Sequence, residues 1–163
     1  MIEITPAKSN EHYQTIETMA NAIWNEHYIP IIGKAQVDYM LDKFQSVAAI
    51  EYQIANGFEY FLLKYVSEAV GYLAIKPEET ALFLSKIYVL SHYRGKKIGK
   101  AAIDFVEEQA KTKSKNSIRL TVNNNNTQSI EAYKKLGFKV TNPIVIDIGN
   151  GFIMDDFEMV KML

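Results

Sequence analysis

Three apolar segments follow one another between residues 58 and 90, and a basic, glycine-containing turn then leads directly into an amphipathic helix. The segments are Phe58–Tyr65, Ala69–Ile75 and Ala81–Leu90, separated by Ser67-Glu68 and by residues 76–79. Connections this short are typical of consecutive antiparallel strands. The sequence therefore predicts a strand meander whose last strand delivers the chain to the N-terminus of a helix.

The other elements extend this meander into a mixed sheet. Further strands are expected at Met1–Thr5, Ser117–Val122, Phe138–Ile148 and near Asp155–Met162, the last after a Gly-Asn-Gly turn. Helices are expected at 10–26, 34–44, 46–56, 97–112 and 127–136. This order predicts an α/β (α+β) protein with a mixed, mostly antiparallel sheet of six or seven strands and helices on both faces.

Composition limits the classes of function. A chain of 163 residues fits one domain, 1–163, and no apolar run is long enough for a membrane helix. The N-terminus has no secretory signal, so a cytoplasmic protein without membrane partners is expected. Cysteine is absent and the three histidines form no metal-ligand pair, so no metal site is expected.

The net charge of −1 conceals a strong asymmetry along the chain. Residues 91–140 carry eleven basic and four acidic side chains, whereas residues 1–60 carry three basic and eight acidic ones. Acidic ends would repel a long polyanion, so nucleic acid is not an expected partner. A compact anion over the basic middle and a cation near the acidic ends fit the pattern better.

The basic middle begins with the turn Arg-Gly-Lys-Lys-Ile-Gly-Lys at residues 94–100. A glycine turn at a helix start directs backbone N–H groups and the positive end of the helix dipole at one point, which suits a phosphate. A Walker A loop is excluded because the glycine spacing is one residue short, and a dinucleotide fingerprint is excluded because Gly-x-Gly is missing.

A second segment, residues 126–138, is a short helix that opens at Asn126, carries Tyr133 and ends in Gly137-Phe138. In this order and spacing the two segments resemble the GCN5-related N-acetyltransferases (GNAT), whose cofactor is acetyl-CoA. The resemblance extends over nearly the whole chain and implies the GNAT fold. It is closest to a bacterial group of small acetyltransferases, and it makes a homodimer a possibility.

The resemblance also implies residue roles. Turn amides would grip the CoA pyrophosphate, backbone groups of the preceding strand would contact the pantetheine, Asn126 would contact the pantetheine or acceptor, and Tyr133 would protonate the departing thiolate. The expected cofactor residues are Ile87, Tyr88, Val89, Arg94, Gly95, Lys96, Lys97, Ile98, Gly99, Lys100, Asn126, Tyr133 and Lys135. Lys97 departs from the family pattern, which has glycine there.

The simplest chemistry is direct attack of an amine on the thioester, assisted by a base that the sequence does not identify. Candidates for the base are Glu26, His27, Asp155 and Asp156. Trp24, Glu26, Tyr28 and Asp155 are the expected acceptor-binding residues, and Tyr39, Phe152 and Met154 are further wall candidates. The acidic ends favour a small cationic amine such as a polyamine. The alternatives are a protein or peptide amine, or a non-catalytic acyl-CoA-binding regulatory protein.

Overall fold

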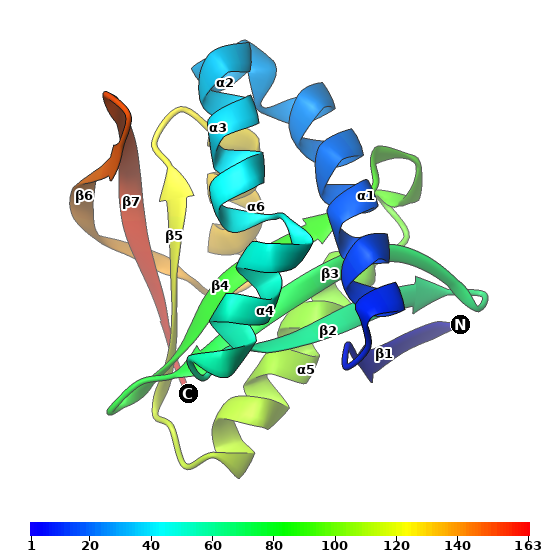
Figure 1. The fold of residues 1–163 in the computed structure, drawn as a ribbon. Helices are drawn as coiled ribbons and strands as arrows, with labels where there is room; N and C mark the ends of the chain where they lie inside the picture. The colour runs from blue at the N-terminus through cyan, green and yellow to red at the C-terminus, as the bar shows by residue number, and fades with distance from the viewer.

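The computed structural model describes all 163 residues, which form one twisted seven-stranded sheet with helices on both faces (Figure 1). The strand order is β1-β2-β3-β4-β5-β7-β6. Only β4 and β5 pair in parallel; the other neighbours are antiparallel. The strands are β1 (Ile2–Pro6), β2 (Glu59–Tyr65), β3 (Glu68–Pro77), β4 (Ala81–Val89), β5 (Ser117–Asn123), β6 (Lys139–Gly149) and β7 (Phe152–Met162).

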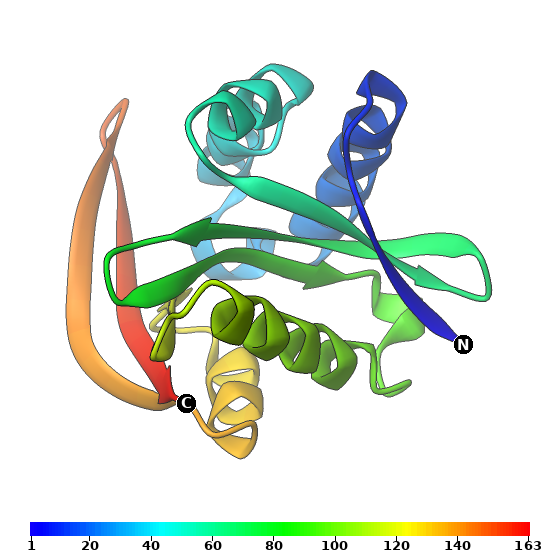
Figure 2. The same cartoon turned by 90° about the horizontal axis from the view of Figure 1, so that it is seen from below.

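The helices divide between the two faces of the sheet, as the view from below shows (Figure 2). They are α1 (Asn10–His27), α2 (Ile29–Ile32), α3 (Lys34–Phe44), α4 (Val47–Ala55), α5 (Ile98–Thr112) and α6 (Thr127–Lys135), with a 3₁₀ turn at Ser91–Tyr93. The first four pack on one face and bury a core that includes Ile16 and Tyr72. Helices α5 and α6 cover the other face, where Ile103 of α5 belongs to the same buried core as Leu73 and Phe138. No helix is long and apolar enough to span a membrane.

The predicted element order and the mixed sheet are confirmed, and local chemistry explains most helix starts. The Ser9 hydroxyl accepts a hydrogen bond from the His12 amide at 3.2 Å, and Ser46 caps α4 through the Ala49 amide at 3.1 Å. Helix α2 was not expected. It forms because Pro30 lies in its first turn, where a proline has no hydrogen bond to lose.

The last strand begins earlier than expected. Gly149 pairs with Phe152 across the turn, so β7 starts at Phe152 instead of near Asp155. The turn contains three residues with positive φ, at Gly149, Asn150 and Gly151, a conformation that glycine and asparagine tolerate. The register of β7 on β5 and β6 decides which β7 side chains face the centre of the molecule.

The sheet divides at its parallel pair. Strands β4 and β5 are in register only from Ala81–Ser117 to Phe83–Arg119. Beyond that point β4 stays paired with β3 as far as Val89, and β5 stays paired with β7 as far as Asn123. The remaining halves of β4 and β5 therefore have free edges that face one another, and the cavity described next lies between them.

Candidate active site

A cavity of about 910 Å³ occupies the space between the diverging strands. Its walls come from both free edges, from Leu84 to Val89 on β4 and from Leu120 to Asn123 on β5. Helices α1 to α3 close it on one side and the starts of α5 and α6 on the other. The cavity is wide enough for a drug-sized ligand or larger, and it lies where the fold leaves backbone groups unpaired.

The basic turn lines one end of this cavity. None of the backbone N–H groups from Gly95 to Lys100 donates a hydrogen bond to another backbone group. The turn is made by two residues with positive φ, Gly95 at 81° and Lys97 at 64°. The six amides at the N-terminus of the 15-residue helix α5 therefore have no backbone acceptor, an arrangement suited to an anion, and the Arg94 and Lys97 side chains add positive charge.

Lys97, which stands where the family pattern has glycine, takes the left-handed backbone conformation. Its φ and ψ are 64° and 20°, and its side chain makes no capping hydrogen bond. A residue with a Cβ pays roughly 1 kcal/mol for this conformation, whereas glycine adopts it freely. Lysine at this position therefore destabilises the backbone slightly but adds a positive charge to the lining of the cavity.

The free edge of β4 continues from the turn along the cavity. The Ile87 and Val89 side chains pack toward α5, whereas Tyr88 packs toward α1. Gly71 of β3 lies behind this stretch, and any Cβ there would overlap the carbonyl oxygen of Tyr88. The edge can thus offer backbone hydrogen bonds to an extended ligand, and its position depends on a glycine in the neighbouring strand.

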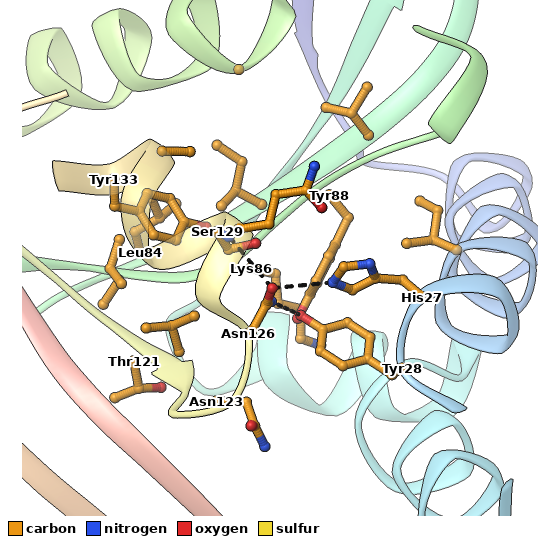
Figure 3. A pocket seen from close by; sticks show the side chains of 18 of the residues that line it. His27, Tyr28, Leu84, Lys86, Tyr88, Thr121, Asn123, Asn126, Ser129 and Tyr133 are labelled. Carbon is orange, nitrogen blue, oxygen red and sulfur yellow. Dashed lines mark hydrogen bonds between the residues drawn. The ribbon is translucent and has the colours of Figure 1, made fainter. Parts of the chain in front are cut away.

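Asn126 is buried and joins two segments that are nearly 100 residues apart (Figure 3). Its side-chain oxygen accepts a hydrogen bond from the Ser129 amide at 3.4 Å and lies 3.3 Å from His27 Nε2. Its amide donates to the Tyr28 hydroxyl at 3.4 Å. The asparagine that caps α6 therefore also fastens the end of α1 over the cavity.

Tyr133 of α6 also lines the cavity, and Figure 3 shows its ring on the same side as Leu84. The ring packs edge-on against Phe138, with 5.8 Å between centroids. Burial raises the pKa of the Tyr133 phenol well above its usual value, and the nearby Tyr28 adds to this. The phenol stays protonated across the physiological range and can act as a proton donor.

An aromatic wall closes the α1 side of the cavity. The Trp24 and Tyr28 rings lie 4.4 Å apart, and Tyr88 lies 5.7 Å from Trp24 and 6.4 Å from Tyr28. Burial is the main cause that raises the pKa of Tyr28 to about 12; hydrogen bonds to Tyr88 and Asn126 oppose the rise, and the charge of Asp156 adds to it. Tyr28 at the end of α1 and Asp156 of β7 line the same cavity.

Asp156 is the single carboxylate among the cavity-lining residues, and only 4% of its surface is exposed. No lysine, arginine or histidine forms an ion pair with it. Burial raises the pKa of Asp156 to about 6, the Thr121 hydroxyl lowers it, and the charge of Asp155 raises it. The group is mostly ionised at pH 7 and can accept a proton there.

Lys86 is a buried cation whose alkyl chain borders the cavity from β4. Its ammonium donates hydrogen bonds to the Phe44 carbonyl, the Tyr60 hydroxyl and the Gln53 side chain, the last at 3.1 Å. Burial lowers the pKa of Lys86 to about 7. These bonds tie β4 to the junction of α3 and α4, and they direct the charge away from the basic turn.

Most of the residues expected from the sequence surround this one cavity, but six do not. The residues that line it are Trp24, Tyr28, Ile87, Tyr88, Val89, Arg94, Gly95, Lys97, Ile98, Gly99, Asn126, Tyr133 and Lys135. The residues outside it are Glu26, Tyr39, Lys96, Lys100, Phe152 and Asp155. Glu26 is exposed and accepts a hydrogen bond from Ser91 at 3.2 Å, and Lys100 pairs with Asp104 at 2.9 Å.

The placement of Asp155 differs from expectation because β7 starts at Phe152. Side chains alternate along a strand, so Met154 and Asp156 share the cavity face while Asp155 is exposed. His27, considered only as a base, lies in the wall as well. Thr121, Gln36 and Met40 line the cavity without any sequence signal, because ordinary residues gain this position only through the packing of distant elements.

The family model for the GNAT acetyltransferases matches residues 17–138, about three quarters of the chain. The chain belongs to the GNAT acetyltransferase family. It is an acetyltransferase, as the two sequence segments predicted, and acetyl-CoA is the acetyl donor of this family. Amines are the acceptors on which GNAT acetyltransferases act.

Solved structures agree with this assignment at the level of the fold. The chain matches the PaiA N-acetyltransferase of Thermoplasma acidophilum in complex with coenzyme A with a TM-score of 0.83, 24% identity and coverage of 100% and 99% of the two chains. A GNAT acetyltransferase of Staphylococcus aureus gives 0.74, with 19% identity over 100% and 99%. One from Elizabethkingia anophelis with bound acetyl-CoA gives 0.62, with 19% identity over 99% and 98%.

Proposed function

We propose that this GNAT protein transfers the acetyl group of acetyl-CoA to the primary amine of a small cationic molecule by direct attack of the amine on the thioester. The observation that carries the proposal is the divided sheet. Its cavity begins at the turn of residues 95–99, whose amides are unpaired with other backbone groups, and leads past the free edge of β4 to a buried carboxylate. In this arrangement the anionic cofactor binds at one end of the cavity and the cationic acceptor binds at the other.

In this proposal the free amides of residues 95–100, with Arg94 and Lys97, hold the pyrophosphate of the cofactor. The extended pantetheine follows the edge of β4 at residues 87–89, and the exposed Lys135 at the rim faces a phosphate of the cofactor. The coenzyme A in the Thermoplasma protein and the acetyl-CoA in the Elizabethkingia protein support the same cofactor here.

The chemistry follows from the groups at the inner end of the cavity. An ammonium of pKa near 10 must lose a proton before its nitrogen can attack the thioester carbon. The C–N bond then forms and the C–S bond breaks, and Tyr133 gives its proton to the sulfur. The second proton of the nitrogen replaces the one that Tyr133 has lost. The products are the amide, CoA and one proton released to solvent.

The test is acetyl-CoA-dependent thiol release over a panel of monoamines, polyamines and peptides, with an amine-free control. The chain has no cysteine, so a thiol reagent reports CoA alone. We expect amine-dependent release, and we expect Tyr133→Phe to lower kcat about 100-fold while acetyl-CoA affinity stays within about threefold. Tyr52→Phe is the matched control because Tyr52 is 71% exposed on α4.

Two results would overturn the proposal in different ways. If Tyr133→Phe left kcat unchanged, Tyr133 would not be the proton donor, but the acetyltransferase activity would still stand. Acetyl-CoA binding without transfer to any amine in the panel would remove the small-amine acceptor. Polyamines, which the acidic ends of the chain favour, and peptide amines are both covered by this panel.

A further inference from the structure

Asp156 is a buried carboxylate that the protein itself leaves without a cation. Its side chain lies in the cavity wall, only 4% of the residue is exposed, and it forms no ion pair. Burying an ionised group without a partner is costly, and such groups are normally paired. A carboxylate that is buried in a cavity wall without a cationic partner is suited to bind a cationic ligand.

The surroundings of Asp156 have an unequal distribution of charge. The cationic side chains of the basic turn and of Lys135 lie at the cofactor end of the cavity, whereas the ammonium of Lys86, which also borders the cavity, is held by the Phe44 carbonyl, Tyr60 and Gln53. The end formed by α1, α2, α3 and β7 has Asp156 as its single carboxylate. Glu26 and Asp155, which might have supplied further negative charge, are exposed and do not line the cavity. This end can therefore neutralise one positive charge.

The remainder of this end is largely apolar. The Trp24 and Tyr28 rings pack on one another at a tilt of 32°, Met154 shares the β7 face with Asp156, and Ile32 of α2 and Met40 of α3 complete the lining. Methionine and aromatic side chains bind apolar groups of varied shape, and aromatic faces also attract cations. A second ammonium would find no carboxylate partner among these side chains and would lose its hydration.

We propose that the acceptor is a primary amine with a single positive charge on an apolar body, whose ammonium is held by Asp156 and whose body packs on Trp24, Tyr28 and Met154. The inference rests on the proposed function and narrows its acceptor away from polyamines. Asp156 then has two roles. It holds the ammonium next to the thioester, and it accepts the proton that the nitrogen must lose before attack and releases that proton to solvent.

A matched pair of amines separates charge from size. Hexylamine and 1,6-diaminohexane have the same carbon chain, but the diamine adds a second ammonium. We expect kcat/KM for hexylamine to exceed that of the diamine and of spermidine at least tenfold, and to rise about two- to fourfold per methylene from propylamine to hexylamine. A preference for the diamine or for spermidine would overturn the inference while leaving the acetyltransferase function established.

Two neighbouring carboxylates provide the matched variants. We expect Asp156→Asn to lower kcat/KM for hexylamine at least 100-fold and to leave acetyl-CoA affinity, measured by calorimetry, within about twofold. Asp155→Asn changes the same chemical group on the exposed face and is expected to behave like the wild type. Asp156→Glu retains the charge and should recover part of the activity, which a purely structural role would not predict.

The outcomes distinguish the two proposals. Full activity of Asp156→Asn toward hexylamine would overturn the role of Asp156, because the acceptor would not depend on its charge. Loss of acetyl-CoA binding in Asp156→Asn would show a structural role and would also overturn it. Acetyl-CoA binding by the wild type without transfer to any amine would overturn the proposed function, and this inference with it.

Discussion

Replacing Asp156 with asparagine should make the protein without ligands more stable at pH 8 but hardly more stable in acid. Burial raises the pKa of this carboxyl from 3.8 to about 6 in the folded chain, and the charge of Asp155 adds to the rise. Tyr28 lines the same cavity, and the Thr121 hydroxyl opposes the rise. The folded state therefore prefers the protonated form more strongly than the unfolded state does.

The sign follows from this preference. A raised carboxyl pKa contributes stability that is fully present below about pH 4 and is lost as the pH rises through about 6. At pH 8 the loss corresponds to about 3 kcal/mol for a shift of two units at 1.36 kcal/mol per unit. Solvent in the cavity screens the charge, so we expect asparagine to recover about 1–2 kcal/mol at pH 8 and much less at pH 4.5.

Urea unfolding of the free protein measures this difference directly. The chain has one tryptophan, Trp24, which is 4% exposed and lies in the same cavity wall, so its fluorescence reports unfolding. Asp155→Asn is the control and should change the free energy of unfolding by less than about 0.5 kcal/mol. A variant Asp156→Asn that is less stable than the wild type at pH 8, or that gains equally at both pH values, would refute the reasoning.

Two further substitutions test the cofactor end of the cavity. Lys97→Gly should raise the free energy of unfolding by about 0.5–1 kcal/mol, because φ is 64° at this position. The same substitution should weaken CoA binding at low salt but not at high salt. Calorimetry at two ionic strengths measures stability and binding, and equal CoA binding by variant and wild type at low salt would contradict the role of the charge. Gly71→Ala should cost at least about 2 kcal/mol and weaken acetyl-CoA binding tenfold or more, since a Cβ would displace Tyr88. Gly99→Ala, where a Cβ meets open space, is the control for stability; a Gly71→Ala protein as stable as this control would contradict the close approach of the two strands.

The placement of Asp156 shows where sequence reasoning reached its limit. The charge pattern and the Gly149–Gly151 turn indicated carboxylates near the acceptor, but the expected start of the strand was near Asp155. Strand alternation assigns opposite faces to neighbouring residues, so an error of a few residues at the strand start leaves the choice of face open. Extending the strand back to Phe152 would have placed Met154 and Asp156 on one face.

The sequence by itself determined the order of the strands and of the longer helices, the glycine-containing basic turn before α5 and the tyrosine helix, because these depend on short-range periodicity, glycine positions and caps. The tertiary structure alone decided that β4 and β5 separate after Phe83, that Asn126 meets His27 and Tyr28, and that Asp156 is buried without a cation. These features join segments that lie far apart along the chain. Contacts of that kind depend on how packed layers fit together, and local sequence patterns carry little information about them.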